Sequence, residues 1–172
     1  MELSTERLKI IPLTLHQFKL LLDGIDKMEK ELKLNASNEC LDGHTQEAMK
    51  GLYQEAVKNR DRYCWYTNWQ IILKSQNKAI GSACFMKCPD ENGEVEIGYG
   101  INSTYQNNGY MTEAAQAICE WAISQHDVSI IIAETEKDNI ASHRVLKKCG
   151  MEKYKETDEG IWWRMRVADN NL

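Results

Sequence analysis

The sequence is poor in proline, has no long hydrophobic run and carries no excess of positive charge. It contains two prolines in 172 residues and no repeat, low-complexity linker or Pro-rich hinge, so we expect a single domain over residues 1–172. No window approaches the ~18 consecutive apolar residues that a membrane-spanning helix requires. The polar start, Met1 to Arg7, has neither a signal-peptide nor a transit-peptide pattern. The sequence therefore predicts a cytoplasmic protein without a membrane partner.

Charge and cysteine usage exclude further classes. The formal net charge is −5, whereas a nucleic-acid partner requires a clustered basic face, so we expect no nucleic acid to bind. The acidity slightly favours a cationic substrate such as an amine. The six cysteines are scattered, with no Cys-x-x-Cys pair and no histidine at zinc-ligand spacing, so we expect no metal site and interpret them as buried reduced thiols.

Hydrophobic periodicity predicts an alternation of strands and helices in the order β, α, α, β, β, β, α, β, α, β, β. The expected strands span residues 8–13, 65–73, 79–86, 94–101, 129–133, 151–157 and 161–167. The expected helices begin after Thr14 and at 45–60, 109–126 and 140–149. The segment 25–44 is the least patterned, and we expect it to be flexible or to face a substrate.

The most informative segment is the strand 94–101, which leads through Gln106-Asn-Asn-Gly109 into a helix. The first amides of a helix have no partner in the preceding turn, and the helix dipole places positive charge there, so a phosphate is the natural ligand. Gly109 allows close approach because it has no Cβ and tolerates positive φ. The alternative is a plain turn that enters a helix.

Two further features of this strand indicate a site. Gly98 and Gly100 interrupt it, which indicates either a bulge or a close approach of another backbone or ligand. Strand alternation places Glu94 and Glu96 on one face and apolar residues on the other. Glu96 is thus a candidate general base on an open face, although a solvated strand glutamate would have the same pattern.

The chain resembles the GNAT superfamily of N-acetyltransferases, and within it the RimJ/RimL-type branch of ribosomal-protein N-terminal acetyltransferases. Four motifs carry the resemblance over nearly the whole length: Thr5-Glu-Arg-Leu, Glu96-Ile-Gly-Tyr, Gln106-Asn-Asn-Gly-Tyr-Met-Thr-Glu-Ala and Asn139-Ile-Ala-Ser-His-Arg-Val-Leu-Lys-Lys-Cys-Gly-Met151. One departure is Met111, where the superfamily usually has a small residue. The resemblance implies an α/β (α+β) fold, with a mixed, mostly antiparallel seven-stranded sheet, helices on both faces, and a splay between strands four and five.

The resemblance also assigns acetyl-coenzyme A to the anion site, with pantetheine in the splay. The implied cofactor-binding residues lie on the central strand, the turn and the last helix. They are Tyr99, Gly100, Ile101, Gln106, Asn107, Asn108, Gly109, Tyr110, Met111, Thr112, Asn139, Ser142 and Arg144. Asn139 has a second interpretation as the cap of the following helix.

The implied chemistry is attack of an amine on a thioester carbonyl. A carboxylate that accepts the amine proton would help at neutral pH, and Glu96 is the candidate. A free amide near Tyr99 to Ile101 would stabilise the oxyanion. Many superfamily members place a tyrosine near the leaving thiolate, but Leu146 stands there in this chain, so Ser142 is the expected substitute. A helix serine that bonds back to a carbonyl is equally consistent.

The sequence therefore predicts an acetyl-CoA-dependent N-acetyltransferase that acts on a protein N-terminal α-amine or a small-molecule amine. We expect direct transfer in a ternary complex, since no cysteine has an obvious basic activator. We expect a monomer or a homodimer. The alternative is a non-catalytic coenzyme A-binding sensor. A nucleotide-phosphate enzyme is disfavoured because the sequence has no Gly-x-x-x-x-Gly-Lys-Ser/Thr motif.

Overall fold

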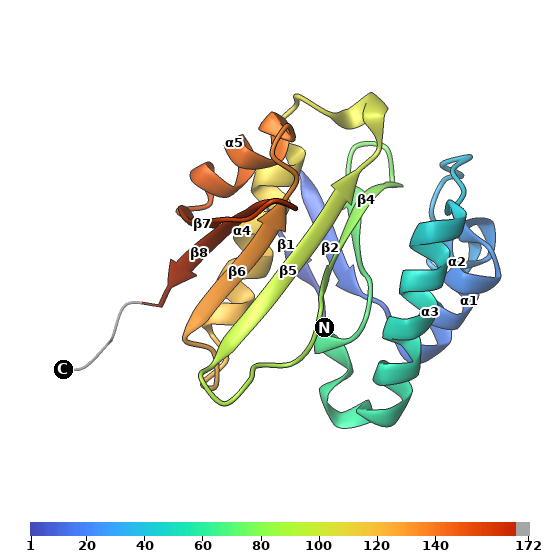
Figure 1. The fold of residues 1–172 in the computed structure, drawn as a ribbon. Coiled ribbons are helices and arrows are strands. Elements are labelled where there is room, and N and C mark those ends of the chain that lie inside the picture. Colours follow the sequence, from blue (N-terminus) through green and yellow to red (C-terminus); the bar gives the residue numbers. More distant parts are fainter. Residues whose placement is uncertain (168–172) are drawn as a thin grey trace.

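The computed structural model describes residues 1–167 and consists of one eight-stranded sheet with helices on both faces (Figure 1). The strand order is β1-β2-β3-β4-β5-β6-β8-β7. The strands are β1 (Leu3–Ser4), β2 (Leu8–Pro12), β3 (Trp69–Leu73), β4 (Lys78–Phe85), β5 (Glu94–Ile101), β6 (Ile130–Thr135), β7 (Glu152–Glu156) and β8 (Ile161–Arg166).

The sheet is mixed, and its one parallel pair within the described residues joins β5 to β6. That pairing covers only Glu94 to Glu96 of β5, opposite Ile130 to Ile132 of β6. On its other side, β5 pairs with β4 from Ile97 through Ile101. The two parallel strands therefore separate beyond Glu96, which confirms the predicted splay.

The helices are α1 (Leu15–Asp23), α2 (Ile25–Glu31), α3 (Gly43–Lys58), α4 (Tyr110–Ile123) and α5 (Ile140–Lys148), with short 3₁₀ turns at Arg60–Trp65 and Ser103–Tyr105. In Figure 1, α4 and α5 lie behind β5, β6 and β8, whereas α1, α2 and α3 lie at the β2–β4 side. Among the described residues, no helix is long and apolar enough to cross a membrane.

Side-chain caps explain where the helices α1, α3 and α5 begin. Thr14 forms a capping box with Gln17 at the start of α1, and Asp42 accepts the amide of Thr45 at the start of α3. The N-terminus of α4 has no side-chain cap, because its N-cap residue is Gly109. Its first amides are left available to another partner.

The largest core cluster fills the space between the sheet and α4. Trp65, Trp69, Phe85 and Trp121 form an aromatic group with ring centroids 4.6–6.3 Å apart. A second apolar cluster, centred on Phe18 and Met28, joins α1, α2 and α3. The second cluster holds the three N-terminal helices together as one group.

Three predictions of the fold need correction. The sheet has eight strands instead of seven, because the two residues Leu3–Ser4 pair with β2. The segment 25–44 contains the helix α2, which was too short and too charged to stand out from its pattern. The predicted strand 65–73 begins only at Trp69, since Trp65 packs its ring into the aromatic core from a 3₁₀ turn.

The glycines of β5 also behave differently from the bulge considered above. The register between β4 and β5 runs without a shift from Phe85↔Ile97 to Gly81↔Ile101. A Cβ at Gly81 would lie 2.5 Å from the carbonyl oxygen of Gly100, and one at Gly98 would lie 2.6 Å from the Met86 methyl group. The close backbone approach of the two strands thus depends on Gly81 of β4, whereas nothing lies within 4 Å of a Cβ at Gly100. The bulge in this region lies between β3 and β4.

Candidate active site

The candidate site is built where β5 and β6 separate. Val95 and Ile97 point into the core, and Glu94 and Glu96 point to the opposite face. This alternation follows from the two-residue period of a strand and confirms the predicted side for Glu96. A pocket of about 280 Å³ lies on that face.

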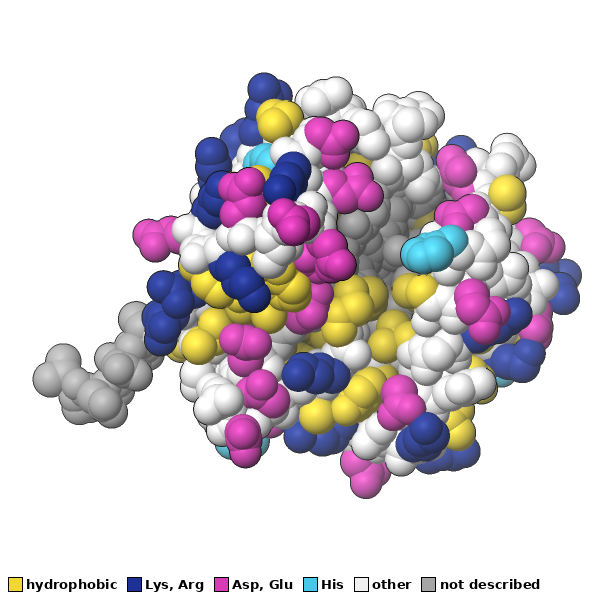
Figure 2. All heavy atoms as spheres, in the orientation of Figure 1, with side chains coloured by type: hydrophobic (Ala, Val, Ile, Leu, Met, Phe, Trp, Pro, Cys, Tyr) yellow, Lys and Arg dark blue, Asp and Glu magenta, His cyan; other side chains and the backbone are white. Residues whose placement is uncertain are grey.

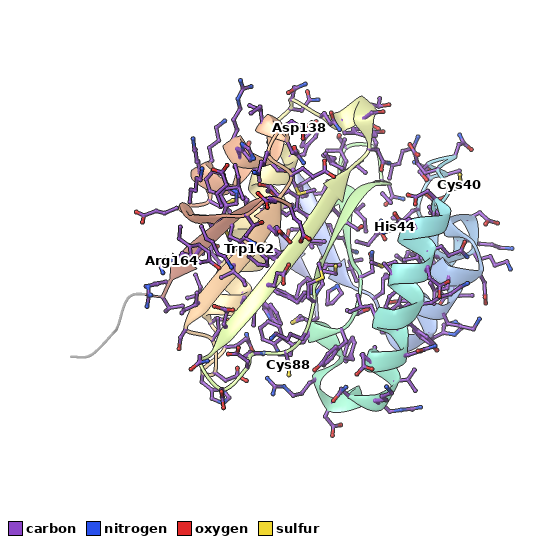
Figure 3. The ribbon with its side chains drawn as sticks, viewed as in Figure 1. Cys40, His44, Cys88, Asp138, Trp162 and Arg164 are labelled. Atoms are coloured by element: carbon purple, nitrogen blue, oxygen red, sulfur yellow. The ribbon has the colours of Figure 1, made fainter. Side chains whose placement is uncertain are left out.

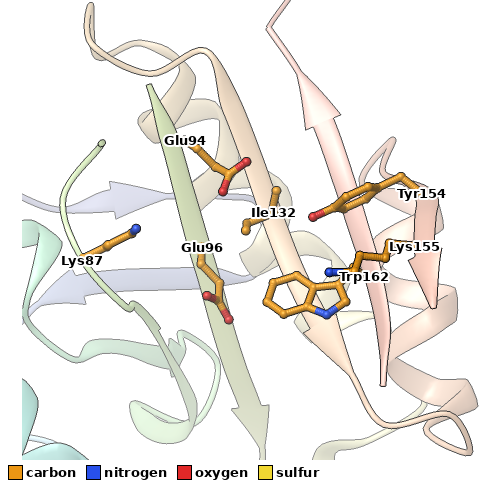
Figure 4. A pocket seen from close by; sticks show the side chains of 7 residues that line it. All are labelled: Lys87, Glu94, Glu96, Ile132, Tyr154, Lys155 and Trp162. Carbon is orange, nitrogen blue, oxygen red and sulfur yellow. The ribbon is translucent and has the colours of Figure 1, made fainter. Parts of the chain in front are cut away.

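Glu96 stands in this pocket between a cation and an aromatic ring (Figure 4). Lys87, from the loop after β4, lies on one side, and Trp162 of β8 lies on the other. The lining is completed by Glu94, Ile132, Tyr154 and Lys155. A carboxylate beside aromatic rings suits a protonated amine, which gains from both the charge and the ring faces.

The surroundings raise the pKa of Glu96 above its ordinary value of 4.5. The largest cause is burial, which penalises the charged form of the carboxyl group. The negative charge of Glu134 raises the pKa further. Lys87 acts in the opposite direction, and Glu94 raises the pKa further. A carboxylate with a raised pKa is a stronger base, which is the property a general base requires.

The N-terminus of α4 has the geometry predicted for an anion site. Gly109 has a φ of 78°, and Asn107 is also left-handed, with a φ of 61°. Glycine and asparagine are the residues that adopt this left-handed conformation most readily. The Asn108 side-chain amide donates to the carbonyls of Tyr105 and Gln106, which fixes the turn internally. Gln106, Asn107, Asn108 and Gly109 are exposed and therefore accessible to a ligand.

Arg7 is a residue of this region that the sequence reasoning did not single out. Its guanidinium donates to the Asn108 carbonyl at 3.0 Å and to Glu113 Oε2 at 2.7 Å, and lies over the Tyr110 ring. Glu113 also accepts from the Arg7 amide. A positive charge is thereby fixed beside the α4 N-terminus. The contacts join residues about a hundred positions apart, so no local pattern could have revealed them.

The last helix meets β5 at Ser142. The Asn139 side chain accepts the Ser142 amide at 3.1 Å, so its capping role is confirmed. The Tyr99 hydroxyl donates to the Ser142 carbonyl at 3.4 Å, and burial raises the pKa of Tyr99 above its ordinary range. Only the backbone amide of Tyr99 was predicted to take part in the chemistry. The fold brings its phenol next to the predicted serine.

His143, next to Ser142 on α5, is buried, with Nε2 3.0 Å from the Glu136 carbonyl and its ring 5.3 Å from Trp163. Arg144 is exposed. The interpretation of the cysteines as buried thiols was wrong for most of them: of the six free cysteines only Cys119 is fully buried, and Cys40 is exposed. Burial nevertheless raises the pKa of Cys84 to about 11 and of Cys119 to about 12, so neither is an activated nucleophile.

The side chains of Trp162 and Trp163 point to opposite faces of the sheet, as strand alternation requires. Trp163 is in the core and donates to the Thr135 hydroxyl, whereas Trp162 lines the pocket. In the other aromatic pair, Trp65 and Tyr66 are both buried, and neither lines a described pocket. Only the pair on β8 therefore contributes to the site.

A second pocket of about 310 Å³ lies on the same face, between the helices α1 and α3 and the strands β3, β4 and β5. Figure 2 shows this face hollowed near its centre, with acidic side chains gathered along one wall. Part of the poorly patterned segment, including Glu39 and Asp42, lines this pocket.

Comparison with known proteins agrees with this geometry. Residues 7–152 match the family model described as the acetyltransferase (GNAT) domain. The chain is 34% identical over 152 residues to the uncharacterized N-acetyltransferase YjdG of Bacillus subtilis, covering 86% of this chain and 88% of that protein. It is 42% identical over 97 residues to the uncharacterized N-acetyltransferase YnaD of the same organism, covering 56% of each chain.

Solved structures show the same fold at low sequence identity. A ribosomal-protein alanine acetyltransferase from Vibrio fischeri superposes with a TM-score of 0.73 at 17% identity, covering 98% of each chain. A RimL ribosomal-protein α-N-acetyltransferase in complex with coenzyme A gives a TM-score of 0.70 at 16% identity, covering 98% of this chain and 100% of that one. With the family model and the YjdG match, these findings show that the chain is an N-acetyltransferase and belongs to the GNAT family.

Proposed function

We propose that this protein transfers the acetyl group of acetyl-coenzyme A directly to a primary amine bound on the Glu96 face of β5. The observation that carries the proposal is the position of half-buried Glu96 at the point where β5 and β6 separate. GNAT enzymes use acetyl-CoA, and the residues present fit this molecule. Uncapped amides and Arg7 lie at the α4 N-terminus, and no β6 residue pairs with β5 beyond Glu96 in the described chain.

The residues proposed to bind acetyl-CoA form three groups. The turn and first α4 residues, from Gln106 to Thr112, would hold the pyrophosphate with their amides. The free edge of β5 from Tyr99 to Ile101 would bond the pantetheine as an added strand does. Asn139, Ser142 and Arg144, at the start of α5, would contact the cofactor from the other side. Acetyl-CoA supplies a thioester, whose carbonyl carbon is the electrophile.

The chain's own groups would then handle the charge and the protons. Glu96 accepts a proton from the ammonium form of the substrate, directly or through water, which frees the nitrogen lone pair. The C–N bond forms and the C–S bond breaks, and the nitrogen gives up its second proton to the leaving thiolate, which departs as the coenzyme A thiol. An amide of β5 near Tyr99 donates to the oxygen that gains negative charge. No acyl-enzyme is required, since burial raises the pKa of the half-buried Cys149 near α4 to about 11.

Ser142 is proposed to donate a hydrogen bond to the leaving thiolate. We expect Ser142→Ala to lower kcat about tenfold without weakening acetyl-CoA binding, because one donor is lost in the step that releases the thiol. Stopped-flow thiol release at saturating substrates would measure this. Tyr99→Phe is the matched comparison, since its hydroxyl lies 3.4 Å from the Ser142 carbonyl. A drop seen in Tyr99→Phe and absent in Ser142→Ala would move the role to Tyr99.

Two variants should shift the pH dependence of activity in opposite directions. Glu96 acts as a base only when deprotonated, so kcat/KM should fall as pH drops through its raised pKa. Glu134→Gln removes a charge that raises this pKa and should move the acid limb to lower pH. Lys87→Met removes a charge that lowers it and should move the limb to higher pH. Shifts in the same direction would contradict the assignment of the limb to Glu96.

The experiment that tests the function is calorimetric titration with acetyl-CoA, followed by thiol release with a panel of amines and N-terminal peptides. Micromolar binding and amine-dependent release are expected. Failure of a folded sample to bind acetyl-CoA would overturn the proposal. Binding without release on any amine would instead favour a coenzyme A sensor over this transfer reaction.

A further inference from the structure

The open face of the sheet around Glu96 carries its side chains in rows that cross the strands. Glu96 of β5 pairs with Ile132 of β6, and Ile132 pairs with Arg164 of β8, so these three residues form one row. The next row joins Trp162 of β8 to Lys155 of β7. Paired residues of neighbouring strands share a face. Figure 3 shows Trp162 and Arg164 on the side of β5 that is away from α3.

The two sides of the pocket at Glu96 carry opposite charges. Glu94 and Glu96 of β5 lie on one side, and Lys155 of β7 lies on the other, with its ammonium group pointing toward β6 (Figure 4). The guanidinium carbon of Arg164 lies 5.0 Å from the centre of the Tyr154 ring, which also lines the pocket. The pocket is therefore acidic at β5 and basic at β7 and β8.

The cations on the β7 and β8 side have no carboxylate partner. Within residues 1–167, Lys155 and Arg164 form no salt bridge, although Glu152 lies opposite Arg164 in register. By contrast Lys87, the cation on the β5 side of the pocket, lies 4.0 Å from Asp90. The charge of Lys87 is thus partly balanced inside the protein, whereas Lys155 and Arg164 remain for an anion that enters the pocket.

Apolar surface separates the two charged sides. Ile132 and the rings of Trp162 and Tyr154 line the pocket between them, and Figure 2 shows basic side chains over and beside a hydrophobic patch on this face, with acidic side chains to its right. Only β6 separates β5 from β8, so the backbones of Glu96 and Arg164 lie roughly 10 Å apart at the usual strand spacing. A pocket of about 280 Å³ is small for a ligand site and suits a small molecule or one residue of a larger one.

The charge distribution restricts the acceptor. A plain monoamine would use the carboxylates and the rings but would leave Lys155 and Arg164 without a partner. A molecule with a second ammonium group would be repelled by both cations. The negative charge of Glu134 also acts on Glu96, so the ammonium group belongs at the β5 end. The pocket therefore suits a molecule with an amine at one end and a carboxylate at the other, joined by carbon atoms that cover the apolar surface.

We infer that the acetyl acceptor bears a carboxylate as well as its reacting amine: the amine is placed at Glu96, and the carboxylate is bound by Lys155 with Arg164 beside it. This inference rests on the proposed function and names the substrate class. A free amino acid and a polypeptide with an acidic first residue share this chemistry. The acetyl group is transferred to the nitrogen as described above, and the carboxylate stays ionised and unchanged.

The test compares each acid with its uncharged amide. Thiol release with acetyl-CoA is measured for straight-chain ω-amino acids, from glycine upward, beside their carboxamides, and for peptides that begin with aspartate beside those that begin with asparagine. In one series or both, kcat/KM should be about tenfold or more higher for the acid, since hydrogen bonds to charged groups are the stronger ones. The series that shows the preference identifies the source of the carboxylate. Equal kcat/KM for acid and amide in both series would overturn the inference and leave acetyl transfer intact.

Variants that remove positive charge locate the preference. Lys155→Met should lower the acid-to-amide ratio of kcat/KM, and the double variant with Arg164→Met should bring it close to one. Lys155 is exposed on the edge strand β7, so its replacement should not disturb folding. Lys153→Met is the matched control and should leave the ratio unchanged, because Lys153 lies on the same strand, pairs with Glu156 and lines neither described pocket. An unaltered ratio in the folded single and double variants would overturn the inference.

Calorimetric titration separates this inference from the proposed function. The same acids and amides are titrated into the protein with and without coenzyme A, and the preferred acid should bind about tenfold or more tightly than its amide. This preference in affinity does not require any transfer of the acetyl group. Failure of acetyl-CoA to bind would overturn the proposed function, and the titrations would still decide whether Lys155 holds a carboxylate.

Discussion

Replacement of Glu96 by glutamine should lower kcat/KM with the amine substrate by about 100-fold or more, since a general base contributes 10²–10⁴-fold. Glutamine keeps the size of the side chain and cannot accept the proton of an ammonium group. The affinity for acetyl-CoA should not change, because the α4 N-terminus and the β5 edge beyond Glu96 remain intact. Thiol release measured together with calorimetric titration of acetyl-CoA separates the two effects.

The same variant should be more stable than the parent protein at neutral pH. The pKa of Glu96 is raised above 4.5 in the folded chain, mainly by burial, so the folded state holds this proton more tightly than the unfolded state does. Stability is therefore lost as pH rises from 4.5 through the raised pKa. Above that window the buried carboxylate is a fixed destabilising charge, which glutamine removes.

Thermal unfolding at two pH values checks whether glutamine at position 96 stabilises the protein at neutral pH only. The Tm difference between Glu96→Gln and the parent should be positive at neutral pH and should shrink below pH 4.5, where Glu96 is protonated in both states. Glu94→Gln, on the same face two residues away, is the control for removal of a neighbouring charge. An unaltered rate of acetyl transfer in Glu96→Gln would show that another group, or water alone, removes the proton.

The central strand shows how far sequence reasoning reaches. Alternation along residues 94–101 correctly placed Glu96 opposite the core face, and the glycine turn correctly marked the α4 N-terminus. Both features are local, because the two-residue repeat of a strand and the residues that begin a helix can be recognised from consecutive positions. The apolar run of β6 also agrees with its parallel pairing to β5, because a strand buried on both faces has no polar alternation.

The features that were missed depend on contacts between distant segments. Arg7 reaches Asn108 and Glu113, and the Tyr99 hydroxyl reaches α5, only after the sheet has formed. His143 likewise packs its ring on Trp163 and places its Nε2 near the Glu136 carbonyl, and both partners are set by the tertiary fold.

The largest effect on cofactor binding should come from Gly109→Glu, which we expect to abolish measurable binding of acetyl-CoA. Gly109 has a φ of 78°, and a Cβ there would lie 3.4 Å from an Arg7 guanidinium nitrogen. A glutamate would therefore strain the backbone, compete for Arg7 and place a negative charge at the start of α4, where a phosphate is proposed to bind. Calorimetric titration with acetyl-CoA measures the loss.

Two matched variants separate these causes. Gly51→Glu adds the same charge on α3, where no atom lies within 4 Å of the new Cβ, and should leave the affinity unchanged. Gly109→Asn keeps a residue that tolerates positive φ and adds no charge, so it should bind more weakly than the parent but far better than Gly109→Glu. If Gly109→Glu folds, as judged by circular dichroism, and binds acetyl-CoA like the parent, the phosphates cannot lie at the α4 N-terminus. In that case the edge of β5 that does not pair with β6 would alone have to account for the affinity for acetyl-CoA.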